Sequence, residues 1–160
     1  MKKERKLVLL IGPPLSGKTR WVNNQKRKGD LYIISRDRIL KENFSDLGET
    51  IFKISKNMKK PDYIRMDKIY VEEMKEGMRL GKDIYVDSYN MSRRDRELFL
   101  EEVSDEYNKE SLCFFVDIDE LYKRNKSKNR TSKISIDYYC KRLEIPLLDE
   151  FDYNRYIFTS

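Results

Sequence analysis

The feature that most constrains this chain is a glycine-bounded segment directly behind the apolar run Leu7–Ile11. It has the pattern glycine, four residues, Gly-Lys-Thr, and reads Gly12-Pro13-Pro14-Leu15-Ser16-Gly17-Lys18-Thr19. Glycines at both ends let the backbone approach phosphate oxygens, and successive N–H groups with the next helix N-terminus bind anions. Lys18 would reach the β- and γ-phosphates, and the Thr19 hydroxyl would ligate Mg²⁺. A β-rich run precedes the segment and Arg20–Lys28 continues as a helix, so it predicts a nucleotide phosphate-binding loop rather than an ordinary glycine turn.

The length and composition predict one globular domain spanning residues 1–160. Hydrophobic and charged residues each make up 39% of the chain, which is rich in charge but typical of a folded protein. No apolar run approaches the roughly 20 residues that a membrane span needs. The start Met1–Lys6 is basic, but the apolar run behind it is too short for a signal sequence. We therefore expect a cytoplasmic protein without a membrane partner.

The residue types that are rare here limit the chemistry. There is no histidine, so a general base must be a carboxylate, a lysine, a tyrosine or a group acting through water. Cys113 and Cys140 show no metal-binding spacing, and we expect both to be reduced thiols. The net charge of +6 is compatible with a polyanionic partner. Basic residues cluster at Lys26–Lys28, Lys56–Lys60 and, most densely, Lys123–Lys133.

Alternating strand and helix patterns predict the fold class. Expected strands are residues 7–11, 31–34, 84–86 and 112–116, with a short terminal one at 156–158. Expected helices are 17–28, 61–81, 92–107 with Ser92 as its cap, 119–126, and 136–143 with Ser135 as its cap. Residues 43–57 are interpreted as a polar, irregular connection. The pattern indicates an α/β fold: a P-loop NTPase-type parallel sheet of four to five strands, with helices on both faces and a basic lid.

Two aspartates follow strands that should end at the same edge as the loop, where parallel sheets bind ligands. Asp37 lies just past the second strand and is placed to accept the proton of a phosphoryl acceptor hydroxyl; alternatively it caps the short helix from Arg38. Asp87 ends the third strand. It can hold Mg²⁺ through water, orient Thr19 or face the acceptor; alternatively it is a capping or turn residue. Arg36 and Arg38 are further candidates for acceptor binding.

The basic segment after the fourth strand is a candidate lid. Mobile basic lids close over phosphates, exclude water and stabilise transferring charge through guanidinium groups. Arg124 and Arg130 are the best candidates for that role, and Lys128 is an alternative to Arg130. The competing interpretation is a solvated, charged helix end. The tyrosine excess is interpreted as core and surface packing.

Taken together, these motifs resemble the 5'-hydroxyl kinase domain of phage polynucleotide kinase, within the P-loop kinases that include zeta-type toxins. The resemblance covers nearly the whole chain. It is carried by the P-loop followed by Trp21, by Ile34-Ser35-Arg36-Asp37, by Asp87-Ser88-Tyr89-Asn90, by Glu120-Leu121-Tyr122-Lys123-Arg124-Asn125, and by Ile136-Asp137. It implies ATP-dependent phosphorylation of a nucleic-acid 5'-hydroxyl, with Asp37 as general base, Lys18 and Thr19 on phosphates and Mg²⁺, and lid arginines Arg124 and Arg130. It also suggests a homo-oligomer.

One departure from the family pattern bears on the acceptor. Three residues after the catalytic aspartate the family usually has an arginine that contacts the acceptor, but this chain has Leu40. This favours an alternative in which the acceptor is a small molecule such as a nucleoside or a nucleotide sugar. A third hypothesis, an ATP-binding module without transfer activity, is disfavoured by intact Lys18, Thr19 and Asp37. No phosphatase domain follows in residues 1–160, so we expect kinase activity alone.

Overall fold

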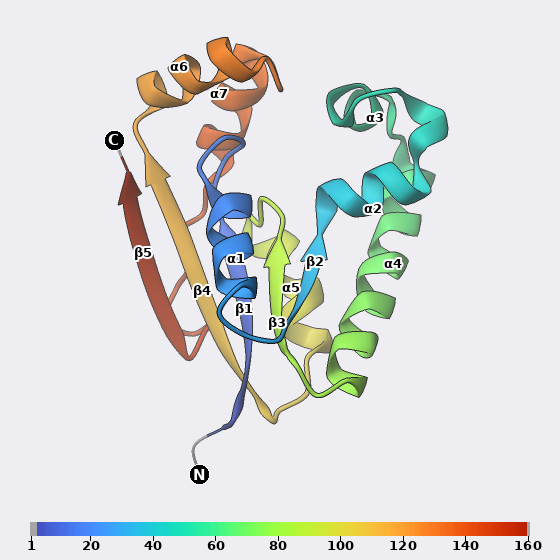
Figure 1. Cartoon of the computed structure of the whole chain (residues 1–160), viewed down its shortest axis with the longest axis vertical. Coiled ribbons are helices and arrows are strands. Elements are labelled where there is room, and N and C mark those ends of the chain that lie inside the picture. The colour runs from blue at the N-terminus through green and yellow to red at the C-terminus, as the bar shows by residue number, and fades with distance from the viewer. Residues whose placement is uncertain (1–2, 160) are drawn as a thin grey trace.

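The computed structural model describes residues 3–159; Met1 and Lys2 of the basic N-terminal stretch, and Ser160, lie outside the described residues. The chain forms a parallel sheet between layers of helices (Figure 1). The strands are β1 (Arg5–Ile11), β2 (Leu31–Ser35), β3 (Asp83–Asp87), β4 (Tyr107–Val116) and β5 (Tyr153–Thr159). The helices are α1 (Lys18–Lys26), α2 (Arg36–Asn43), a 3-10 turn (Ser45–Leu47), α3 (Ile51–Asn57), α4 (Lys60–Arg79), α5 (Arg93–Glu102), α6 (Ile118–Lys128) and α7 (Lys133–Arg142).

The sheet has the order β2-β3-β1-β4-β5, and every neighbouring pair runs parallel. The predicted α/β fold with a parallel sheet is therefore confirmed, with five strands. β1 lies in the centre, where both of its faces are covered, which explains why Val8–Ile11 is a continuous buried apolar run. The carboxyl ends of all the strands point to one edge, and the segment after β1 lies at that edge (Figure 1).

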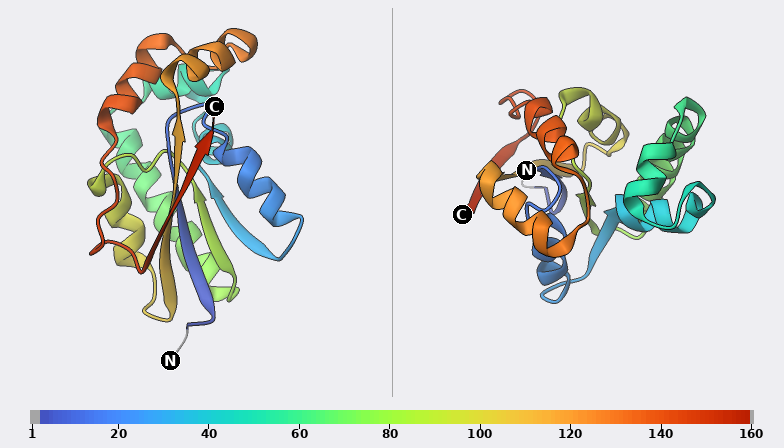
Figure 2. Two further views of the ribbon diagram at one scale, coloured as in Figure 1. Left: turned by 90° about the vertical axis from the view of Figure 1, so that its left-hand side faces the viewer. Right: turned by 90° about the horizontal axis from the view of Figure 1, so that it is seen from above.

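Alternate residues of the central strand divide the core between the two faces of the sheet. Leu7 and Leu9 pack with α4 and α5 through residues such as Met74 and Phe99. Val8 and Leu10 pack on the opposite face with Val22 of α1. The two views in Figure 2, from the side and from above, show α1 on one side of the sheet and α4 and α5 on the other. This arrangement holds the start of α1 directly beside the sheet edge.

The connection over residues 43–57 is more regular than expected. It contains the 3-10 turn and α3, and the prediction of an irregular segment is wrong. The Thr50 hydroxyl caps α3 by accepting a 3.2 Å hydrogen bond from the Lys53 N–H. Ile54 is buried, so the apolar patch noted in this segment is the inner face of a short helix. The helix formed because a tertiary contact stabilises a sequence too short to be helical alone.

Other boundaries also differ from prediction: β4 begins at Tyr107 rather than at residue 112, and β5 at Tyr153 rather than at residue 156. The helix from Ser92 ends at Glu102 instead of near Tyr107, because Val103 is extended and Tyr107 begins β4. Val103 and Tyr107 continue the apolar spacing of the helix, but the chain leaves the helix after Glu102 and buries both side chains as it enters the sheet. The last helix begins at Lys133 with Ser132, not Ser135, as its cap. Across residues 3–159, no helix is both long and apolar enough to span a membrane.

Candidate active site

The loop from Gly12 to Thr19 joins β1 to α1. A Cβ added at Gly12 would lie 2.8 Å from Ser16 Oγ and 3.1 Å from Phe114 Cβ, so the backbone here packs too closely for a side chain. Gly17 has φ +97°, a left-handed conformation that glycine adopts without strain, and α1 begins at the next residue. The sequence pattern therefore forms the tight turn into a helix N-terminus that it predicted.

Lys18 is buried and its ammonium group lies against the loop itself. Nζ donates hydrogen bonds to the carbonyls of Gly12 (2.7 Å) and Pro13 (2.8 Å). Burial lowers the pKa of Lys18 to about 8, against the opposing effect of the nearby Asp87 and Asp37 carboxylates. A loop phosphate would offer this ammonium group a charged partner in place of neutral carbonyls, so the geometry suits an anion-binding role.

Thr19 and Asp87 meet at the same place. Thr19 Oγ1 donates a 2.7 Å hydrogen bond to Asp87 Oδ2. Burial raises the pKa of Asp87, while this hydrogen bond and the charge of Lys18 oppose the rise. A carboxylate and a hydroxyl oxygen are the ligand types that Mg²⁺ takes beside substrate phosphates. Of the possibilities considered for Asp87, the structure shows the contact with Thr19, and the pair fits a magnesium ion.

Asp37 lies in the first turn of α2 and does not cap that helix. The cap is Ser35, whose hydroxyl accepts from the Arg38 N–H at 3.3 Å, so the capping alternative for Asp37 is wrong. The Asp37 side chain is 59% exposed. Ser35 pairs in register with Asp87, which places the start of α2 at the edge where the loop lies. An exposed carboxylate at this position is accessible to an acceptor molecule.

The two arginines beside Asp37 have different surroundings. Arg36 is mostly buried; Nη2 donates to Ser55 Oγ at 2.9 Å, and Nη1 lies 3.6 Å from Asp37 Oδ1. Among the described residues, Arg36 Nη1 has no hydrogen-bond partner. Arg38 instead forms ion pairs with Glu42 and Glu73, both at 3.1 Å. Arg36 is therefore brought to the candidate site, whereas Arg38 is directed toward carboxylates of α2 and α4.

Leu40, the position that departs from the family pattern, is fully buried in the core under α2. Its side chain belongs to the apolar face of the helix, while Asp37 is on the exposed side. An acceptor-binding side chain could not project from position 40 without leaving this core. The departure therefore has a packing explanation in this fold.

The basic residues predicted to form the lid also have different surroundings. Arg124 of α6 donates through Nη1 to the Leu15 carbonyl at 2.9 Å and through Nε to Glu120 at 3.0 Å. The hydrogen bond from Arg124 to the Leu15 carbonyl joins the basic helix α6 to the phosphate-binding loop across the sheet edge. Arg130 and Lys128 are exposed, and within residues 3–159 no hydrogen bond or ion pair links either of them to the loop.

Tyr89, which the sequence predicts only as a packing residue, also contacts the candidate site. The Tyr89 ring lies 5.1 Å from Lys18 Nζ and 5.0 Å from the Arg36 guanidinium carbon. Its other neighbour is Tyr139 of α7, with ring centroids 4.3 Å apart. The signal in the sequence was its position two residues after Asp87, at the carboxyl end of β3. Tyr89 thus connects the loop, α2 and the candidate lid.

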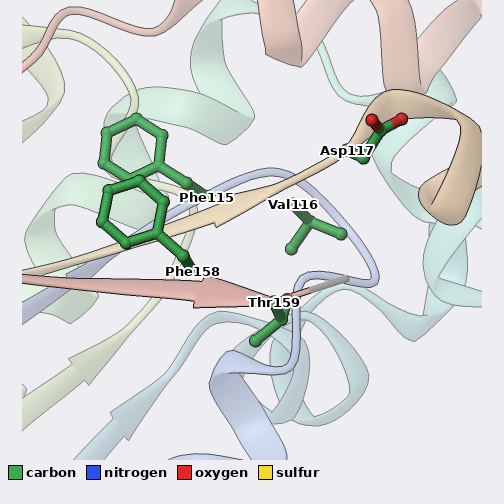
Figure 3. A pocket seen from close by; sticks show the side chains of 5 residues that line it. All are labelled: Phe115, Val116, Asp117, Phe158 and Thr159. Carbon is green, nitrogen blue, oxygen red and sulfur yellow. The ribbon is translucent and has the colours of Figure 1, made fainter.

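A shallow hollow of about 450 Å³ lies at the carboxyl ends of β4 and β5. Figure 3 shows its lining residues: Phe115, Val116, Asp117, Phe158 and Thr159. The Phe115 and Phe158 rings are stacked, with centroids 5.2 Å apart. The preceding residue of β4, Phe114, packs close to Gly12, but its side chain is on the opposite face of the strand from Phe115.

Several solved structures share this fold. A protein from Chloroflexus aurantiacus J-10-fl described as a kinase superposes with a TM-score of 0.70 at 16% identity, covering 99% of this chain and 87% of that one. A sugar kinase from Janibacter sp. HTCC2649 gives 0.69 at 16% identity, covering 96% and 85%. A chain of the Pnkp1/Rnl/Hen1 complex gives 0.54 at 20% identity, covering 78% of this chain and 40% of that one. At these identities the comparison establishes the fold of P-loop kinases.

A comparison with curated proteins finds no match. At the level of families, the sequence matches the AAA domain over residues 7–143, from the middle of the first strand to the residue after α7. The matched range contains the phosphate-binding loop, both aspartates and the candidate lid. The chain therefore belongs to the AAA-domain family and has the fold of a P-loop kinase.

Proposed function

We propose that this protein transfers the γ-phosphoryl group of ATP to a hydroxyl group, and that the acceptor is the 5'-hydroxyl end of a polynucleotide. The observation that carries phosphoryl transfer is the exposed Asp37 carboxylate at the sheet edge shared with Lys18, Thr19 and Asp87. A site built only to hold a nucleotide needs no such carboxylate. Transfer to an alcohol needs a group that accepts its proton.

The donor half of the site is formed by the loop. Backbone N–H groups at the end of the loop, from Gly17 to Thr19 at the N-terminus of α1, would hold the phosphates, with Lys18 on the β- and γ-phosphates. Thr19 and Asp87 would hold Mg²⁺, which when bound supplies positive charge to the β- and γ-phosphate oxygens. The stacked Phe115 and Phe158 offer an apolar surface for the donor base at the carboxyl ends of β4 and β5.

The acceptor half is formed by α2. Asp37 orients the acceptor hydroxyl and takes its proton as the new P–O bond forms, while the bond between the γ-phosphorus and its bridging oxygen breaks and ADP leaves. Arg36, with one buried donor free among the described residues, binds an acceptor oxygen next to the reacting hydroxyl. Arg124 moves from the Leu15 carbonyl to the transferring group, where its guanidinium stabilises the charge of the transition state.

Charge supports a polynucleotide acceptor. Lys56, Lys59 and Lys60, in and after α3, are exposed on one side of the carboxyl edge of the sheet. The exposed basic residues of α6 and the segment after it lie on the other side (Figure 1). A strand whose 5' end reaches Asp37 would meet positive charge on both sides, and each neutralised phosphate adds salt-dependent affinity.

A second candidate keeps the mechanism but replaces the polynucleotide by a small hydroxyl compound. It is favoured by Leu40, which is buried, and by Arg38, which Glu42 and Glu73 already pair. Arg36 is then the basic side chain that lies against Asp37. One such group suffices for a small acceptor with a single anionic or polar substituent.

The deciding experiment is a phosphoryl-transfer assay with ATP and Mg²⁺. The acceptors, tested in parallel, are a 5'-hydroxyl DNA oligonucleotide, a 5'-hydroxyl RNA of the same sequence, a nucleoside and a set of sugars. The same DNA with a 5'-phosphate is the matched control. We expect label on the 5'-hydroxyl oligonucleotides and none on the blocked one. Turnover with nucleosides or sugars alone would replace the first candidate by the second, and no transfer to any acceptor would overturn both.

A further inference from the structure

Arg96 of α5 is the largest of the fully buried side chains of residues 3–159, and 1% of it is exposed. All three of its guanidinium nitrogens donate hydrogen bonds. Nε and Nη2 form a two-point pair with Glu150 at 2.9 and 3.0 Å. Nη1 donates to the carbonyls of Asn90 (3.0 Å), Met91 (3.2 Å) and Glu144 (2.9 Å). The catalytic proposal above does not use this residue.

One of the segments that Arg96 contacts supports the phosphate-binding loop. The carbonyl of Tyr89 accepts a 3.1 Å hydrogen bond from the Gly12 N–H. The Asn90 side-chain amide donates to the Leu10 carbonyl at 2.8 Å. Residues 89–91 therefore lie directly against the end of β1 and the first residue of the loop.

The other segment is the connection from 144 to 150, which follows α7. It is tied to residues 89–91 by the 2.8 Å bond from the Glu144 N–H to the Met91 carbonyl. The Glu150 carboxylate also accepts a 3.1 Å hydrogen bond from the Leu147 N–H, which is a bond within the connection itself. The buried Arg96 guanidinium and its partner, the Glu150 carboxylate, thus hold this connection against residues 89–91.

The candidate lid, α6 and α7, has two attachment points: Asp117, directly after β4, and Glu144, just after α7. Arg96 binds the second of these. Between the two points, Arg124 reaches the Leu15 carbonyl and Tyr139 packs on Tyr89. Arg96 holds the second attachment point against residues 89–91, and this contact constrains the position of α7 relative to the loop.

We propose that Arg96 is a positioning residue that holds the end of the lid, so that Arg124 meets the donor phosphates in the geometry that transfer needs. This role rests on the proposed function. An apolar replacement would take one donor from each of three carbonyls and two donors from the buried Glu150 carboxylate. A lysine has no planar fork to serve them together. The choice of arginine is explained by the need to join two segments, since a buried ion pair by itself adds little to stability.

Two variants test the role. Arg96→Lys keeps the positive charge beside Glu150 but loses the fork. Glu150→Gln keeps the size of the side chain and releases only the charged pair. Arg93→Ala is the matched control: it removes an exposed ion pair from the same helix to Asp149 of the same connection. Arg93 has no role in the proposed site.

Hydrogen exchange tests the structural part without relying on activity. We expect faster exchange over residues 118–142 in Arg96→Lys, a smaller increase in Glu150→Gln, and wild-type exchange in Arg93→Ala, with β1 and β4 protected in all three. Unchanged exchange of the lid in both variants would overturn the role. So would a uniform loss of protection through the sheet, which indicates general destabilisation. If Arg96→Lys does not fold, Glu150→Gln decides.

Kinetics test the positioning part. We expect kcat to fall about 10- to 100-fold in Arg96→Lys, as for a catalytic group displaced by about 1 Å, with the Kd for ATP unchanged because the loop is intact. Arg124→Ala should then cost much less in the Arg96→Lys background than in the wild type. Additive losses would overturn the proposal. If the wild type itself transfers no phosphate, the proposed function fails while hydrogen exchange still decides the role of Arg96 in holding the lid.

Discussion

Thr19 Oγ1 donates a 2.7 Å hydrogen bond to Asp87 Oδ2 and so joins the first turn of α1 to the last residue of β3. These residues are far apart in sequence, and the register of the sheet brings them together. Asp87 pairs with Leu10 of β1, two residues before the phosphate-binding loop begins. The carboxylate therefore lies where it can contact a cation bound to Thr19.

This relationship predicts the effect of Asp87→Asn. The amide oxygen can still accept from Thr19, so the fold should be retained, but the charge that attracts Mg²⁺ is lost. We expect the Mg²⁺ needed for half-maximal phosphoryl transfer to rise about 10- to 100-fold. A magnesium titration of the transfer rate measures it. Asp83→Asn, at the other end of the same strand, is the control and should titrate like the wild type; an unchanged titration in Asp87→Asn would refute the metal role.

Asp37→Asn should separate transfer from nucleotide binding. The amide cannot take the acceptor proton, so we expect the rate of transfer to fall by about 10²–10⁴. ATP affinity, measured by calorimetry, should stay at the wild-type value because the side chain is exposed and outside the loop. Asp46→Asn, an exposed carboxylate beyond α2, is the matched control. Wild-type transfer by Asp37→Asn would show that another group is the base.

The parts of the fold that could be predicted are those with a local cause. Val8–Ile11 is apolar without interruption because both faces of a central parallel strand are covered, and Gly12 and Gly17 are where the turn needs them. The edge position of Asp37 and Asp87 followed from strand direction alone. Where the cause is a tertiary contact, the sequence was ambiguous: Tyr107 continued a helical spacing but is buried in β4, where its hydroxyl donates to the Lys82 carbonyl.

The candidate site shows the same division. Lys18 and Thr19 lie within one motif, and their roles are proposed from that motif. Tyr89 lies in a segment that carries the family resemblance, but that segment predicts no contacts for its ring, and Arg96 lies in no motif. The neighbours of both residues come from separate helices and loops that folding brings together. Leu40 could be noted as a departure, but its burial depends on how α2 packs on α4 and β2.

The packing of Leu40 predicts that an arginine cannot be restored at this position. Leu40→Arg would bury a charge without a partner, and we expect a loss of about 3–5 kcal/mol in the free energy of unfolding. Chemical denaturation measures it, with the exposed neighbour Lys41→Arg as the control. A Leu40→Arg protein of wild-type stability with faster transfer to oligonucleotides would contradict the packing explanation.

Arg124 and Arg130 should differ in their effect on catalysis. Arg124 already contacts the loop through the Leu15 carbonyl, and in the proposed mechanism its guanidinium turns to the transferring phosphoryl group. We expect Arg124→Ala to lower kcat by about 10³-fold, as for arginines that stabilise phosphoryl transfer. Arg124→Lys should recover little, since a lysine lacks the fork.

The same assay on Arg130→Ala and Lys128→Ala identifies the second lid residue. Both side chains are exposed, so neither variant should change stability. We expect Arg130→Ala to lower kcat more than Lys128→Ala, because a guanidinium binds phosphate oxygens at two points. A larger loss in Lys128→Ala would assign the role to the lysine, and wild-type rates in both would leave Arg124 as the lid's catalytic group.

The buried position of Lys18 predicts that ATP binding is linked to protonation. Burial lowers the pKa of Lys18 to about 8, so the free protein loses this charge as the pH rises through that value. Bound phosphates favour the ammonium form and raise the pKa again, so binding must take up protons at and above about pH 8. We expect ATP affinity to fall several-fold between about pH 8 and pH 9, where the phosphates themselves are already fully ionised. Calorimetry in buffers of different ionisation enthalpy measures the uptake directly. Lys18→Met, which has no group to titrate, should bind weakly and without this uptake; a wild-type affinity that is constant over the same range would show that Lys18 stays charged in the free protein.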